Sequence, residues 1–188
     1  MGIFDQLKNK TKSAVGAAIS NLGNKSETFT FTALPESVDQ MKMLPEAAMD
    51  TPFKTAALTV CALCAYAAAP DIGIEMLNYL RGPRPMNGQD ISFIKDRFRG
   101  ERTYLPFSYF AGATPDNDYT PSEPYVLTVS SDSHSYDEDG YARLYIACGG
   151  ADSPRPVKLR KKGDGQWCLW EQYLLTDIRQ PKSSDPWA

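Results

Sequence analysis

Residues 141–178 decide the fold of this chain and read YARLYIACGGADSPRPVKLRKKGDGQWCLWEQYLLTDI. Three runs rich in β-forming residues are separated by two clusters of turn residues, which is the pattern of an antiparallel meander. Asp164 and Gly165 supply the positive φ angles that a tight hairpin turn requires. In the middle run, Val157 and Leu159 alternate with cationic side chains, so this strand should have one buried and one solvated face.

The last run of the meander carries a pair of tryptophans close to a basic cluster. Because side chains alternate across a strand, Trp167 and Leu169 should share one face and Cys168 and Trp170 the other. Basic residues beside aromatic rings are ingredients of a surface for single-stranded nucleic acid. A solvated strand whose lysines discourage edge pairing gives the same pattern. The chain has a net charge of −3 and no RNP-like motif, so nucleic acid is not the expected partner. The basic cluster comprises Arg155, Lys158, Arg160, Lys161 and Lys162.

The first half of the chain is expected to be mainly helical. Residues 52–68 are rich in alanine and apolar almost all round, which is typical of a buried helix. Apolar spacings of three and four predict further helices over 71–80, capped by Asp71, and over 87–98. Alternating phenylalanine and threonine predict a strand over 28–33. This order predicts an α+β fold in which N-terminal helices pack on an antiparallel sheet formed mainly by the C-terminal half.

The N-terminal segment has a composition of its own. Residues 1–22 carry apolar side chains at helical spacing with lysines off that stripe, which predicts a basic amphipathic helix. Residues 1–26 contain four lysines and one aspartate, a net charge of +3. We therefore divide the chain into a helix with a short linker, 1–26, and one α+β domain, 27–188. The helix could lie on a membrane surface, on a protein partner, on a second copy of the chain or on its own domain.

The cysteines and the apolar stretches indicate a reduced, cytoplasmic protein. Four cysteines in 188 residues are too few and too scattered for a disulfide scaffold. The N-terminus lacks the apolar region of a secretory signal. The longest apolar stretch, 56–69, has 14 residues and is too short to span a bilayer. We expect a cytoplasmic protein, with contact to the inner face of the membrane through residues 1–22 as an open alternative.

The residues that most often carry chemistry do not form a convincing site. Cys61 and Cys64 have the CxxC spacing, but they lie inside an apolar helix without a second ligand pair, so buried thiols are expected rather than a metal or redox site. His134 is the single histidine and lies in a polar, acidic stretch typical of a solvated turn. No glycine-rich phosphate loop is present. We therefore expect no metal and no cofactor.

Several C-terminal motifs resemble an uncharacterised bacterial family known only as a domain of unknown function. They are DSPRPVKLRK at 152–161, WCLWE at 167–171, IRQP at 178–181 and DPWA at 185–188. The resemblance extends over about 28–188 and implies no chemistry. The first eight residues resemble the amphipathic start of bacterial membrane-associated proteins of the phage-shock type. Helices followed by a curved sheet also resemble the cone of nuclear-transport-factor-2-like proteins, which hosts both enzymes and binding modules.

These observations favour a non-enzymatic binding or interaction domain with an N-terminal docking helix. Its partner would be another protein, a second copy of the chain, or a membrane surface. The alternative is an enzyme or small-ligand binder with a pocket between helices and sheet. In either case the residues expected to contact a ligand or partner are Arg155, Trp167, Trp170 and Tyr145.

Overall fold

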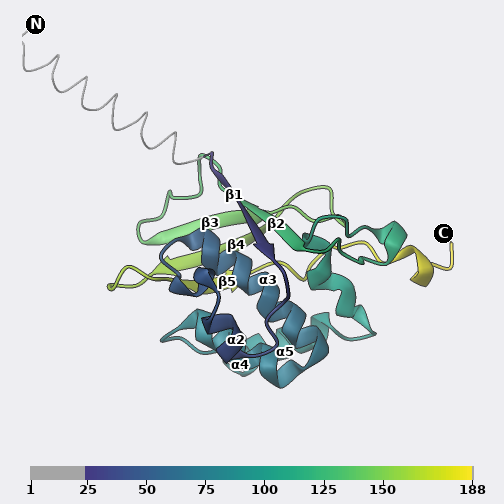
Figure 1. Ribbon diagram of the computed structural model, residues 1–188, viewed down its shortest axis with the longest axis horizontal. Coiled ribbons are helices and arrows are strands. Elements are labelled where there is room, and N and C mark those ends of the chain that lie inside the picture. Colours follow the sequence, from purple (N-terminus) through teal and green to yellow (C-terminus); the bar gives the residue numbers. More distant parts are fainter. Residues whose placement is uncertain (1–23, 188) are drawn as a thin grey trace, which may run out of the picture.

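The computed structural model describes residues 24–187 and confirms the α+β fold (Figure 1). One open antiparallel sheet of five strands has the order β1-β2-β3-β4-β5, so every strand pairs with its neighbours in sequence and β1 and β5 form the edges. The strands are β1 Ser26–Phe31, β2 Tyr125–Ser130, β3 Tyr141–Ile146, β4 Arg155–Lys161 and β5 Trp167–Gln172. The predicted meander therefore forms β3 to β5.

One long helix, α3 (Pro52–Ala68), covers the inner face of the sheet. It begins at Thr51, whose Oγ1 accepts a hydrogen bond from the amide of Lys54 at 3.4 Å, and Pro52 fits the first turn because it needs no donor there. Of its 17 residues, 14 are buried, which confirms the predicted buried helix. Its alanines allow strands and helices to approach it from nearly every side.

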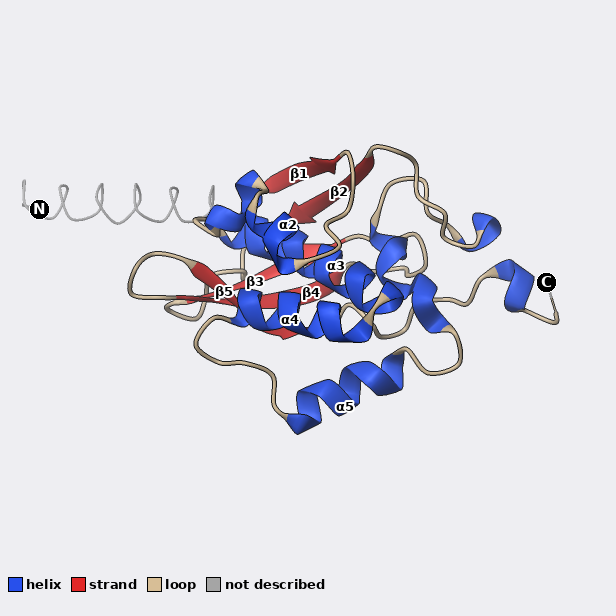
Figure 2. Ribbon diagram, turned by 60° about the horizontal axis from the view of Figure 1, so that its bottom comes forward, coloured by secondary structure: helices blue, strands red, loops and turns tan. Residues whose placement is uncertain are grey.

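Two further helices form an outer layer. They are α4 (Pro70–Arg81) and α5 (Gly88–Arg97). Figure 2 shows α5 at the periphery of the molecule. Asp71 does not cap α4 as predicted, because Pro70 already occupies the first helical turn, where its fixed φ and missing N–H are tolerated. The remaining helical segments are short: α2 Val38–Lys42 and 3₁₀ turns at Pro45–Ala48, Arg102–Tyr109, Pro115–Asn117 and Lys182–Ser184.

The last two strands show how the meander separates its two faces. Leu159 of β4 is fully buried and pairs with Leu169 of β5 on the inner face. The register shifts between Leu159 and Lys158, because Lys158 pairs with Glu171. Trp170 is therefore the extra residue on β5 between the two pairs. Trp170 thereby lies on the outer face, opposite Leu169, as the alternation predicts.

The first strand sets the boundary of the folded domain. β1 begins at Ser26, and the preceding Lys25 already exchanges hydrogen bonds with Ser131: its amide donates to Oγ at 3.1 Å, and its carbonyl accepts from the Ser131 amide at 2.8 Å. The predicted amphipathic helix over 1–22 lies outside the described residues. Within 24–187, no helix has the length and apolar character needed to cross a bilayer.

Candidate functional site

Two arginines and two aromatic rings meet on the outer face of the sheet, at the edge formed by β5. The guanidinium carbon of Arg84 lies 4.1 Å from the ring centre of Trp170, and that of Arg160 lies 4.9 Å from the same centre. The ring of Tyr141 meets Trp170 edge-on at 5.5 Å. Such cation–π and edge-to-face contacts hold the groups in fixed positions. We call Arg84, Tyr141, Arg160 and Trp170 the basic-aromatic corner.

The two guanidinium groups of the corner have N–H donors that are available to a ligand. Arg84 and Arg160 are both exposed, and neither forms an ion pair with another of residues 24–187. Stacking on a ring uses the flat face of a guanidinium and leaves its N–H groups pointing outward along its edge. Those edges match the geometry of carboxylate and phosphate oxygens, which Arg binds through paired hydrogen bonds.

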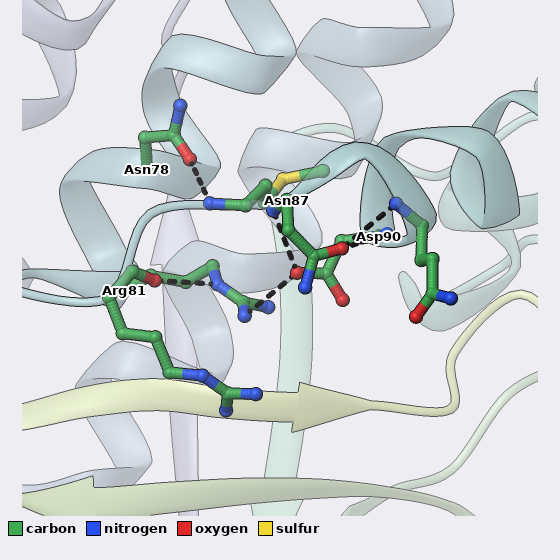
Figure 3. A network of polar contacts seen from close by, with 7 residues as sticks. Asn78, Arg81, Asn87 and Asp90 are labelled. Carbon is green, nitrogen blue, oxygen red and sulfur yellow. Dashed lines mark hydrogen bonds and ion pairs between the residues drawn. The ribbon is translucent and has the colours of Figure 1, made fainter.

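A buried arginine fixes the loop that carries Arg84. The side chain of Arg81, at the end of α4, is 9% exposed and pairs with Asp90 of α5 at 3.1 Å (Figure 3). Its Nε also donates to the carbonyl oxygen of Arg84 at 3.0 Å. Burial lowers the pKa of the Arg81 guanidinium, and the nearby Asp90 carboxylate opposes this effect, so the group stays cationic.

The other end of the same loop is held by side-chain caps. The Oδ1 atom of Asn78 accepts a hydrogen bond from the amide of Met86 at 2.8 Å. Asn87 caps α5, accepting from the amide of Asp90 at 3.0 Å, while Asp90 accepts in return from the Asn87 amide at 3.0 Å (Figure 3). The capping box holds the α5 end of the loop, and the bonds of Asn78 and Arg81 tie the loop to α4, so the backbone at Arg84 is held in place before any ligand arrives.

A glycine lets the loop pass around the edge strand. Gly82 ends α4 with φ of +59°, and a Cβ atom there would lie 2.9 Å from Sγ of Cys168. Any other residue would therefore be strained and would push the loop away from β5. Because β5 is an edge strand, the loop can reach past it and place Arg84 on the outer face.

A hollow of about 420 Å³ opens beside the corner, between the α4–α5 loop and the β4–β5 hairpin. Every charged side chain of the described residues that lines it is cationic. Two of them have acidic partners: Arg81 pairs with Asp90, and Lys162 pairs with Asp164 at 2.7 Å. A hollow with cationic walls and unpaired guanidinium groups is suited to an anionic ligand. The cationic residues are Arg81, Arg84, Arg160, Lys161 and Lys162.

Two of the four predicted contact residues form hydrogen bonds that hold the fold together. Arg155 donates through Nε to the carbonyl of Thr176 at 3.0 Å and through Nη2 to that of Asp177 at 2.6 Å, so it fastens the segment after β5. Trp167 is half-buried, and its carbonyl accepts from Oγ1 of Thr55 at 2.6 Å, which ties β5 to α3.

The other two predicted contact residues lie on the outer face but not together. Tyr145 lines a separate polar hollow of about 370 Å³ with Lys158 and Glu171. Trp170 alone belongs to the corner, where its partner Arg84 comes from the loop between α4 and α5. No local pattern could identify Arg84, because the contact depends on where α4 ends relative to β5.

The cysteines and the histidine occupy the places that the sequence indicates. Cys61 and Cys64 are buried, and burial raises the pKa of both thiols, so they stay protonated. His134 lies on an exposed turn, where Nδ1 is 2.9 Å from Oδ2 of Asp137. In the part of the chain that the structure describes, no three His, Cys, Asp or Glu side chains are grouped so as to hold a metal ion.

The fold and the corner define an α+β domain with an open sheet and a cationic edge. Residues 33–182 match the model of a family described as Domain of unknown function (DUF6935), and the chain belongs to this family. The match confirms the resemblance to a family known only as a domain of unknown function. It includes the whole corner and the loop that holds Arg84. No curated protein and no solved structure matches the chain.

Proposed function

We propose that this domain is a non-enzymatic binding module that docks on an anionic membrane surface through its basic-aromatic corner. The observation that carries the proposal is the pair of guanidinium groups of Arg84 and Arg160, held on Trp170 without an ion pair among residues 24–187. Phospholipid headgroups present phosphate oxygens, for which arginine is well suited. Tryptophan favours the membrane–water interface because its ring is apolar and its N–H is polar.

The position of the corner supports a membrane in preference to a small soluble anion. The corner lies toward the end of the sheet where β4 finishes and β5 begins, next to Lys161 and Lys162 of the hairpin. The chain enters β1 at the same end, on the opposite edge (Figure 1). Residues 1–22, whose pattern predicts a basic amphipathic helix, precede that entry point. A basic corner at the same end of the domain as the point where a basic segment is attached suits a flat anionic surface.

The energetics explain why both features are needed. A basic side chain near an anionic membrane contributes about 1 kcal/mol. Arg84, Arg160 and Lys161 together would then contribute roughly 3 kcal/mol, which fades beyond a Debye length of about 8–10 Å. Such a contribution alone gives weak, reversible binding. Insertion of the apolar stripe of residues 1–22 would add the hydrophobic part.

Sedimentation with lipid vesicles tests the proposal. The full chain should bind vesicles of phosphatidylglycerol and phosphatidylcholine but not vesicles of phosphatidylcholine alone, and added salt should weaken the binding. A chain lacking residues 1–23 should bind more weakly while keeping its melting temperature, because Lys25 retains its hydrogen bonds to Ser131. Equal binding to both kinds of vesicle would refute an electrostatic surface. A lower melting temperature of the shortened chain, without loss of vesicle binding, would show that residues 1–23 support the fold.

A further inference from the structure

A second hollow lies at the far end of α3, remote from the corner. Its volume is about 660 Å³, within the range of roughly 300–1,000 Å³ that is typical of pockets for small molecules. The hollow is bounded by the C-terminal turns of α3, by the segment that follows β1, and by the start of β2. None of the residues of the basic-aromatic corner lines it.

The hollow exists because the end of α3 carries small side chains. Ala65, Ala68 and Ala69 face it, where larger residues would fill the space. Around them stand bulkier apolar groups, including Leu34 and Phe107. The walls are therefore mainly apolar, and an apolar molecule placed there would be removed from water.

The charges at this hollow all have one sign. Among residues 24–187, Glu36 and Glu123 are the only charged residues that line it, and both are exposed. Neither forms an ion pair with a cation elsewhere in 24–187; Glu123 instead accepts a hydrogen bond from the hydroxyl of Tyr125 at 3.4 Å. The two carboxylates reach the hollow from different segments, the one after β1 and the one before β2. An apolar hollow with two unpaired carboxylates favours a cation over an anion.

We infer that the hollow at the end of α3 binds a small amphiphilic molecule with an apolar body and a cationic amine head. The apolar walls around Ala65 and Ala68 would take the body, and Glu36 and Glu123 would face the ammonium group. This inference is independent of the membrane proposal, because it rests on other residues and calls for a ligand of opposite charge.

The head group should contribute selectivity more than affinity. Ion pairs between exposed groups are weak, because water screens them and because long side chains lose freedom. Two such pairs should favour an amine over an uncharged analogue of equal length by about three- to tenfold. The carboxylic acid of the same length should bind worst, because its charge has the same sign as the two glutamates.

Isothermal titration of the full chain with decylamine, 1-decanol and decanoate, each below its aggregation threshold, tests this inference. We expect affinity to fall in that order. The Glu36→Gln/Glu123→Gln variant should bind all three with similar affinity. The charge-matched Glu75→Gln/Glu101→Gln variant, altered at exposed positions away from the hollow, should keep the preference for the amine.

A pocket-filling variant separates this site from other apolar surfaces of the chain. Ala68 is exposed in the hollow, so Ala68→Leu should fold normally, which its melting temperature checks, and should lose at least tenfold in affinity for decylamine. Unchanged decylamine binding by folded Ala68→Leu would overturn the inference. So would a wild-type chain that binds decanoate as tightly as decylamine, or one that binds none of the three.

Discussion

The guanidinium of Arg84 lies over the ring of Trp170, with 4.1 Å between the guanidinium carbon and the ring centre. The two residues come from different halves of the chain, one from the loop after α4 and one from the last strand. Arg160 approaches the same ring at 4.9 Å. Holding both arginines in advance reduces the side-chain entropy that a ligand would otherwise have to offset.

Replacing Asp90 should destabilise the domain and release the loop that carries Arg84. Asp90→Ala removes the ion pair of Arg81 and one half of the α5 capping box. Breaking a fully buried ion pair costs about 3–5 kcal/mol, and because the Asp90 side chain is 30% exposed we expect about 2 kcal/mol. Urea unfolding measures the change. Asp96→Ala, on the same helix with exposed partners, should cost less than about 1 kcal/mol, and equal losses would contradict this account of the loop.

The close approach of α3 and α4 should depend on a single glycine. A Cβ atom on Gly73 would lie 2.3 Å from the Cα of Tyr66, so Gly73→Ala must push the two helices apart. Overpacking of this kind costs about 1–3 kcal/mol. Gly88→Ala, in the first turn of α5 with no atom near the new methyl group, should instead be neutral or stabilise by about 0.5–1 kcal/mol. Thermal unfolding of both variants measures these changes. Equal melting temperatures for Gly73→Ala and Gly88→Ala would show that α3 and α4 do not pack closely at Gly73.

The single histidine provides a test of the turn between β2 and β3. The hydrogen bond to Asp137 raises the pKa of His134 above its ordinary value of about 6.5. A raised pKa stabilises the fold at pH values below the unfolded pKa, and this contribution is lost as the pH rises through the folded pKa. Proton NMR can follow the one imidazole directly, and Asp137→Asn should lower its pKa. If the titration midpoint does not move in that variant, the contact is absent in solution.

Much of the fold follows from local sequence patterns. The alternation of Val157 and Leu159 with cationic residues predicts β4 with its buried face, and the alanine-rich pattern of 52–68 predicts α3. Both predictions are correct because each hydrophobic pattern identifies side chains that must be buried in the finished fold. The placement of Trp170 opposite Leu169 was predictable for the same reason.

The candidate sites depend on relations that no local pattern contains. Arg84 reaches Trp170 because α4 stops at Gly82 beside Cys168, a contact between distant segments. The hollow at the end of α3 arises because the side chains of Ala65 and Ala68 are too small to fill it. In the sequence these residues indicate only good helix formers. The bonds of Arg155 to the carbonyls after β5 likewise join segments whose approach no local pattern predicts.

The corner's role in binding is tested most directly by removing its two free guanidinium groups. Arg84→Ala/Arg160→Ala should fold normally and bind vesicles of phosphatidylglycerol and phosphatidylcholine roughly 30-fold more weakly than the unaltered chain, since each basic group contributes about 1 kcal/mol. The matched control, Lys95→Ala/Arg102→Ala, removes the same charge from exposed positions outside the corner and should bind like the unaltered chain. Equal weakening in both variants would mean that only net charge matters, and unchanged binding in the corner variant would show that the corner is not the contact surface.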